Sequence, residues 1–201
     1  MNICVNFETW TIADGSYTPM KKGDEVVFSI GIDIKKSKKI NKLKRKQKSL
    51  VHKKYSNYHF SGEVIYKSQY HKDILVVDTG IFKFFIQVRD IASYEIGQTI
   101  SGEGSLSIDS YEWMHIWSED GAPHIYYDFE IERILGSVAA VYKETDLDDD
   151  SFIDGEAGIE IINLSTSFDD ELIEMNDIYE EGLVLNCFDL KMIKEAELFE
   201  Q

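Results

Sequence analysis

Apolar and polar residues alternate along several segments of this chain, and the alternation restricts the folds that it can adopt. Every second residue from Val26 to Ile34 is apolar, and the same period runs from Ile125 to Ile131. Because successive side chains of a strand point to opposite faces, a period of two predicts half-buried β-strands. The sequence therefore predicts a mainly β protein, in which the last apolar run, Leu183 to Ile193, is either a strand or a helix.

Turn residues divide the chain into a series of strands. The turn pairs Asp14-Gly15 and Gly23-Asp24 lie between the run at residues 3–12 and the strand at residues 26–34. This arrangement predicts an N-terminal strand pair. Further strands are expected at 60–67, 74–78, 81–88, 98–108 and 124–134. Residues 89–96 leave room for only one or two helical turns between the third and fourth of these strands.

The order of three strands, a short segment and two more strands over residues 59–134 resembles the OB-fold, a five-stranded Greek-key barrel. The turn Asp78-Thr79-Gly80, the glycine Gly97 before a strand and the Gly102-Glu103-Gly104 sequence carry this resemblance. Glycines inside a strand mark bulges or barrel corners, so the strand is expected to bend at residues 102–104. The resemblance implies a small closed barrel and concerns the fold alone.

Charge is segregated along the chain. The 201 residues carry a net charge of −16, but residues 35–54 hold 11 of the 21 basic residues and no acidic one. Residues 143–201 hold 19 acidic and 3 basic residues. Opposite fields at two places indicate either that the two segments dock on each other or that they bind different partners.

These observations together predict four regions. Residues 1–34 form the strand pair, 35–58 a basic linker, 59–136 the OB-like barrel, and 137–201 an acidic C-terminal region. The linker is expected to be exposed because it lacks a long amphipathic period. A helix-start signal at Ser167 makes the last region an acidic α/β extension, either packed on the barrel or separate from it.

A search for chemical sites gives no catalytic, metal or cofactor motif. Residues 146–157 begin like a calcium loop, but Ser151 replaces the required glycine and Ala157 the required bidentate glutamate. The five histidines show no zinc-ligand spacing, and Gly102 to Leu106 matches neither a nucleophile elbow nor a phosphate loop. We therefore expect a protein that is not an enzyme and has no cofactor.

The sequence also predicts the compartment. The first ten residues lack a basic and then apolar signal pattern, and no stretch reaches the roughly 20 apolar residues of a spanning helix. Cys4 and Cys187, the two cysteines, are typical of reduced thiols in a chain with a sizeable core. A cytoplasmic protein with no membrane partner is the expectation.

The first hypothesis for function is a non-enzymatic protein-binding module whose acidic surface engages a basic partner. In composition the chain is similar to acidic bacterial immunity proteins, whose carboxylates would imitate nucleic acid on a basic surface. Aromatic anchors would supply short-range binding energy. The expected partner-binding residues are Asp146, Asp148, Asp149, Asp150, Asp154, Glu156, Trp113 and Trp117.

The alternative is an OB-fold protein that binds nucleic acid through the basic run 35–54 and the aromatic residues of the barrel. This hypothesis explains the 11 clustered basic residues. Against it, residues 55–142 carry 5 basic and 13 acidic residues, whereas a binding groove for phosphates should be basic. The sequence favours the protein-binding hypothesis and does not set an oligomeric state.

Overall fold

The computed structural model describes residues 1–7, 20–34, 40–44, 47–69, 71–108, 121–138, 166–167 and 183–195. Within these ranges the chain is almost entirely extended, with a single short 3-10 helix, η1 (Ile91–Ser93). None of the helices in these ranges is long and apolar enough to cross a membrane. The expectation of mainly β structure is confirmed. The strands are β1 (Asn2–Asn6), β2 (Glu25–Ile34), β3 (Asn41–Leu43), β4 (Ser49–Lys54), β5 (Asn57–Lys67), β6 (Ile74–Asp78), β7 (Lys83–Gln87), β8 (Thr99–Ile108), β9 (Tyr126–Val138), β10 (Thr166–Ser167) and β11 (Leu183–Glu195).

Eight of these strands pair in a closed circuit and form a mixed β-barrel. The circuit runs β8-β5-β6-β7-β2-β9-β11-β1 and returns to β8. The pairs β2–β7 and β1–β8 are parallel, and the other pairs in the circuit are antiparallel. Closing the circuit satisfies backbone groups that an open sheet would leave at its edges.

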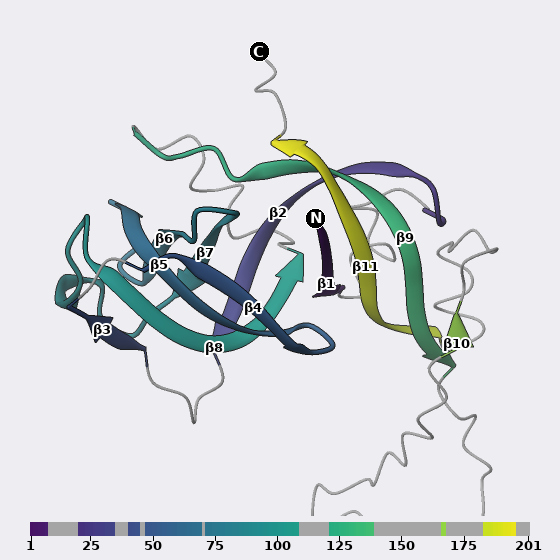
Figure 1. The fold of residues 1–201 in the computed structure, drawn as a ribbon, viewed down its shortest axis with the longest axis horizontal. Helices are drawn as coiled ribbons and strands as arrows, with labels where there is room; N and C mark the ends of the chain where they lie inside the picture. The colour runs from purple at the N-terminus through teal and green to yellow at the C-terminus, as the bar shows by residue number, and fades with distance from the viewer. Residues whose placement is uncertain are drawn as a thin grey trace, which may run out of the picture.

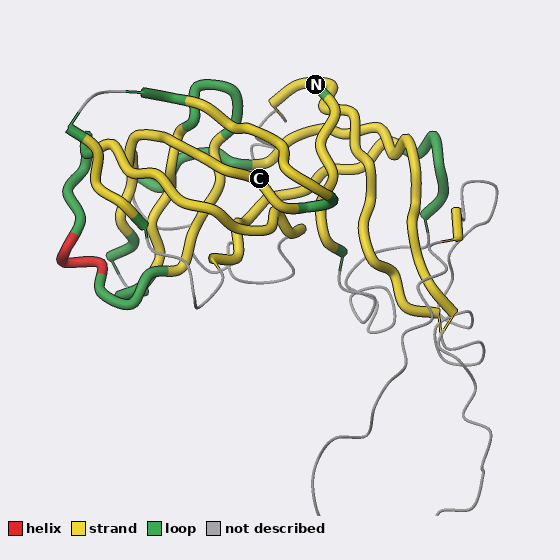
Figure 2. Tube along the Cα trace, turned by 60° about the horizontal axis from the view of Figure 1, so that its bottom comes forward, coloured by secondary structure: helices red, strands yellow, loops and turns green. Residues whose placement is uncertain are grey.

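β2 and β8 also pair with each other and divide the barrel into two halves. Residues 25–29 of β2 pair with β9, whereas residues 30–34 pair with β8. We call β5, β6 and β7 the meander half, and β1, β9 and β11 the terminal half. Figure 1 shows β5, β6 and β7 in the left part of the view and β9 and β11 in the right part, with β2 crossing between them. Figure 2 shows the same strands from another side.

Aromatic side chains fill both halves. In the meander half, the rings of Phe60 and Phe84 meet edge to face at 5.4 Å. In the terminal half, Phe7 stacks on Phe188 with ring centroids 4.6 Å apart. All four side chains are buried, and burial of each stabilises the fold by about 1.5–3 kcal/mol.

The glycines at 102 and 104 lie where β8 changes its partners. Residues 99–105 of β8 pair with β5, and residues 104–108 pair with β2. A Cβ atom at Gly104 would lie 2.5 Å from the backbone oxygen of Asp33, so only glycine allows β2 to approach this closely. A Cβ at Gly102 would instead meet the Phe60 ring, at 2.8 Å.

Several pairings differ from those that the local pattern indicates. β2, expected in a separate strand pair, belongs to the barrel through β7, β8 and β9. Residues 41–43 and 49–54, expected in an exposed linker, form β3 and β4. β11 joins the barrel through β1 and β9. β2, β3 and β11 are held by partners that are distant in sequence, whereas β4 is held by β5, the next strand along the chain.

Candidate functional site

All eight partner-binding residues expected from the sequence lie outside the described residues. They are Asp146, Asp148, Asp149, Asp150, Asp154, Glu156, Trp113 and Trp117. The candidate site described below is therefore formed by other side chains.

The described part of the chain is electrically balanced. It holds 14 basic and 14 acidic residues, so the net charge of −16 belongs to the rest of the sequence. Many of the described charges are paired across strands: Lys83 with Glu195, Arg133 with Asp189, Lys191 with Glu130, and Lys194 with Asp128. Any strongly one-signed surface on these strands must therefore be local.

One such surface is the hairpin of β4 and the start of β5, residues 49–59, which we call the basic hairpin. Its sequence, SLVHKKYSNYH, contains two lysines and two histidines and no acidic residue. β4 lies at one end of the strand order, and its residues 51–54 are exposed. Lysines on an edge strand also oppose pairing with other chains, so charge alone does not identify a binding surface.

The tip of the basic hairpin has an unusual backbone. Tyr55 has a φ of 52°, the left-handed region that glycine and asparagine favour, and its side chain is 61% exposed. The Tyr55 carbonyl is 2.6 Å from Nε2 of His52, and Nδ2 of Asn57 donates to the Lys54 carbonyl at 3.2 Å. These contacts hold a bulky aromatic residue in a conformation that it rarely adopts.

Contacts with other strands fix the base of the tip. Ser56 is buried, its hydroxyl donates to Oδ1 of Asn6, and its carbonyl accepts from the Leu106 amide at 2.8 Å. The Tyr58 hydroxyl accepts from the Cys4 amide at 2.8 Å, and the Tyr58 ring lies 4.9 Å from the His52 ring. The barrel therefore presents the exposed tip from a rigid support.

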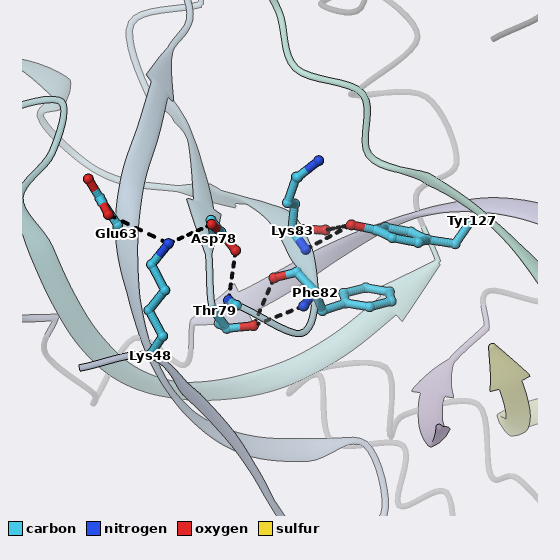
Figure 3. A network of polar contacts seen from close by, with 8 residues as sticks. Lys48, Glu63, Asp78, Thr79, Phe82, Lys83 and Tyr127 are labelled. Carbon is cyan, nitrogen blue, oxygen red and sulfur yellow. Dashed lines mark hydrogen bonds and ion pairs between the residues drawn. The ribbon is translucent and has the colours of Figure 1, made fainter. Parts of the chain in front are cut away.

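Four of the described lysines of the basic run fall into two groups. Nζ of Lys48 lies 2.6 Å from Asp78 and 3.5 Å from Glu63, as Figure 3 shows. Nζ of Lys42 donates to the carbonyl of Ser93, the last residue of η1. Lys53 and Lys54 make no ion pair with any described residue, and Nζ of Lys54 lies 4.7 Å from the centre of the Tyr55 ring. The first group docks the run on the barrel, and the second is available at the tip.

The Lys48 contacts change the protonation equilibria of the pair. The hydrogen bond with Asp78 is the largest influence on Lys48, and its pKa is raised above 10.5. Burial works to raise the pKa of Asp78, but the bonds from Lys48 and from the Gly80 amide outweigh it, and the pKa is lowered from 3.8. The pair is thus charged over the whole neutral range and joins the basic run to the β6–β7 turn.

That turn also connects the two halves. The Thr79 hydroxyl donates to the Phe82 carbonyl and accepts from the Phe82 amide, which closes the turn (Figure 3). The Tyr127 hydroxyl of β9 accepts from the Lys83 amide at 2.8 Å, and its ring stacks on Phe82 at 4.2 Å. Burial raises the pKa of Tyr127 well above its ordinary value, so this phenol stays protonated. Its role is structural.

A groove of about 410 Å³ lies where β2 and β7 separate. Its apolar wall is formed by Ile32, Ile34 and Val88, and its charged groups are Asp33, Asp73 and Arg89. Among the described residues, no group of three or more histidine, cysteine or carboxylate side chains is placed to hold a metal ion.

Searches of protein-family models, of curated proteins and of solved structures find no match to this chain. The functional interpretation therefore depends on the geometry of the chain itself.

Sequence reasoning identified the charge of the basic run but not the hairpin within it. The turn-forming pair Ser56-Asn57 between Leu50-Val51 and Tyr58-His59-Phe60 is the signal that could have located the turn. The left-handed conformation of Tyr55 has no sequence signal, because glycine or asparagine would be expected there. The groove was missed because it depends on a parallel pairing of distant strands.

Proposed function

We propose that this protein is a non-enzymatic binding module that binds single-stranded nucleic acid through the basic hairpin. The observation that carries the proposal is Tyr55, an exposed aromatic residue in the left-handed region beside Lys54. Aromatic rings that accept bases by stacking, together with cations that contact phosphates, are the usual means of binding single strands. Backbone strain at an exposed ring favours a function over a purely structural role.

The surroundings of the tip support this proposal. Lys53 and Lys54 are exposed and unpaired among the described residues, so binding a phosphate would break no ion pair. The sequence alone favoured the acidic segment because residues 55–142 are net acidic. The basic hairpin itself, residues 49–59, contains no acidic residue. The net acidity of residues 55–142 is therefore no argument against phosphate binding at the hairpin.

We further propose that the meander half, with β8 and part of β2, is an OB-like barrel. β5, β6 and β7 form an antiparallel meander, η1 follows, and β8 returns to pair with β5. In this interpretation β2 takes the place of the fifth strand, because it pairs with both β7 and β8. OB-folds bind oligonucleotides with strand faces and the loops beside them.

The test measures binding of a fluorescent oligothymidylate of about 12 nucleotides, a length within the site sizes of OB-folds, by anisotropy at several salt concentrations. The double variant Lys53→Gln/Lys54→Gln should weaken binding and reduce the salt slope by about 1.4, since each phosphate contact on a single strand contributes about 0.7. Lys21→Gln/Lys22→Gln removes the same charge from exposed residues before β2 and should change neither. Equal effects of the two variants would contradict the proposal. Lys53 and Lys54 would then serve only to prevent the edge strand β4 from pairing with other chains.

A second pair of variants separates stacking from charge. Tyr55→Leu should weaken binding by about 1–3 kcal/mol, the usual contribution of one stacked base, while Tyr55→Phe should retain it. Loss of binding in both variants would indicate a role of the hydroxyl, which stacking does not explain.

A second candidate function is the one that the sequence favoured, an acidic surface that binds a basic protein as an immunity protein or inhibitor would. The balance of 14 basic and 14 acidic residues on the described strands favours it, because the whole excess of −16 is then concentrated in the other segments. An excess of this size would steer a basic partner and make association depend strongly on salt.

Its test compares the wild-type chain with a six-site variant in which Asp146, Asp148, Asp149, Asp150, Asp154 and Glu156 become Asn or Gln. A specific basic protein should be recovered from host lysate by the wild type and lost from the variant. Because one exposed ion pair contributes only about 0–1 kcal/mol, single substitutions should have little effect. Recovery of the same proteins by both chains would leave the acidic segment as a device for solubility.

A further inference from the structure

The sheet has an open edge at β4. β4 is the last strand of the strand order, and among the described residues β5 is its only strand partner. Residues 51–54 are all exposed, and the apolar side chain of Val51 is 47% exposed. The backbone donors and acceptors on the outer edge of such a strand can pair with an added strand. An extended segment of another chain therefore finds room for pairing at β4.

Contacts with the barrel hold this edge in place. β4 pairs with β5 at five positions. Just before β4, the Gln47 carbonyl accepts from the Ser61 hydroxyl at 2.7 Å, and Lys48 is paired with Asp78. Because β4 is already extended and supported, an added strand would require little ordering of the protein, which lowers the entropic cost of binding.

The charges of the edge select the kind of strand that can pair with it. Lys53 and Lys54 are exposed and make no ion pair with a described residue, and the basic hairpin holds no acidic residue. Lysines on an edge oppose pairing with basic strands and with a second copy of the same edge, because like charges would be brought together. A strand that carries carboxylates removes this obstacle, since each ammonium group gains a partner.

We propose that β4 binds an acidic segment of a partner protein, which pairs with its outer edge as an added strand. The backbone of β4 would supply the hydrogen bonds, and Lys53 and Lys54 would supply the preference for carboxylates. The proposed function assigns the same two lysines to phosphates, so the acidic strand and nucleic acid would exclude each other. This exclusion rests on the proposed function, whereas the pairing itself does not.

The test titrates the full chain with a fluorescent peptide of eight residues in which glutamate and valine alternate, and follows binding by anisotropy. The peptide should bind saturably and should protect the amides of residues 49–54 from hydrogen exchange, while the amides of β7 keep their rates. Absence of saturable binding, or protection elsewhere than at β4, would overturn the proposal. Protection of β4 that rises with protein concentration before any peptide is added would make a second copy the occupant and would also overturn it.

A matched peptide separates strand pairing from charge. The same sequence N-methylated at two adjacent central residues keeps every carboxylate but loses one backbone donor on each of its edges, because successive residues point their amides to opposite sides. It should bind at least about tenfold more weakly than the unmodified peptide, since pairing hydrogen bonds are lost. Equal binding of the two peptides would reduce the interaction to charge and overturn the proposal.

Variants and competition complete the test. Lys53→Gln/Lys54→Gln should weaken binding of the unmodified peptide about threefold or more, while Lys21→Gln/Lys22→Gln, with the same loss of charge, should not. Equal weakening by both would overturn the assignment of the lysines. The unmodified peptide should also displace fluorescent oligothymidylate from the wild type, and simultaneous binding of both ligands would overturn the exclusion. If oligothymidylate does not bind at all, the proposed function fails, while the peptide titration still decides whether β4 pairs with an acidic strand.

Discussion

The meander half and the terminal half contain similar strands but are assembled in different ways. In the meander half, β5 pairs with β6 and β6 with β7, so partners follow one another along the chain. In the terminal half, β1 pairs with β11, and Asn2 lies opposite Lys191. The comparison shows that one barrel can combine local hairpins with pairings that depend on almost the whole chain length, and that β2 and β8 make the two interdependent.

The largest effects should come from matched truncations in the two cores. Phe60→Ala in the meander half and Phe188→Ala in the terminal half should each lower the free energy of unfolding by about 3–5 kcal/mol, since both side chains are fully buried. Urea unfolding followed by far-UV circular dichroism measures the change. Because β2 and β8 serve both halves, each variant should still unfold in one transition.

Hydrogen exchange sharpens that comparison. In the Phe188→Ala chain, amides of β6 should lose protection together with those of β9, although β6 is in the other half. If β6 kept its protection while β9 lost it, the halves would be separate cooperative units, and the shared pair β2–β8 would not couple them.

A smaller effect is expected at the junction of the halves. Gly104→Ala should destabilise the chain by about 1–3 kcal/mol, because its Cβ would meet the Asp33 backbone, which cannot move without disturbing β2. Gly102→Ala should cost less, since the Phe60 ring that it meets can shift. Thermal denaturation of both variants checks the order, and a larger loss for Gly102→Ala would contradict the geometry.

The Lys48–Asp78 pair tests how firmly the basic run is attached to the meander half. Lys48→Met should lower the free energy of unfolding by about 0–1 kcal/mol, as expected for a partly exposed pair. The lowered pKa of Asp78 contributes stability that is present above about 3.8 and lost as the pH falls through the folded-state value. The raised pKa of Lys48 contributes stability that is present below 10.5 and lost at higher pH.

The difference between wild type and Lys48→Met, measured by urea unfolding at several pH values, should therefore be greatest between these limits and vanish in acid. Lys53→Met is the control and should show no such pH dependence, because Lys53 has no ion pair among the described residues. If the difference in the free energy of unfolding persisted at a pH where Asp78 is protonated, packing of the Lys48 side chain, and not its ion pair, would be the cause.

The smallest change in stability is expected at Tyr55. Glycine adopts a φ of 52° without strain, but it also increases the entropy of the unfolded chain, so Tyr55→Gly should change the free energy of unfolding by no more than about 1 kcal/mol in either direction. The same variant should lose most oligothymidylate binding if the proposed function holds. Chemical denaturation and anisotropy on one sample would show whether stability and binding separate in this way.

Local pattern predicted the strands better than it predicted their partners. Alternation located β2, β5, β6, β7, β8 and β9, and the gap before β8 proved to hold η1. The closed barrel was expected, but the sequence placed β2 outside it because pairing with β7 and β8 leaves no trace in the residues near 30. The lysines of β4 obscured a strand that depends on β5 for its register.

The candidate site was less predictable than the fold. The basic run was singled out for its charge, whereas the position of Tyr55 at the hairpin tip depends on hydrogen bonds from His52 and Asn57 and on a rare backbone conformation. The acidic residues and the tryptophans chosen from the sequence lie outside the described residues, so their role stays a prediction.

The pairing of β1 with β11 has a consequence for how the protein is made. On the ribosome β1 emerges early, but its antiparallel partner is synthesised more than 180 residues later. At roughly 5–20 residues per second, β1 waits on the order of ten seconds or more with its pairing groups and the Phe7 side chain uncovered. The hairpins of the meander half can form during that interval. We expect nascent chains that end before β11 to be bound by chaperones, and release of the C-terminal strand to be the event that lets the barrel close.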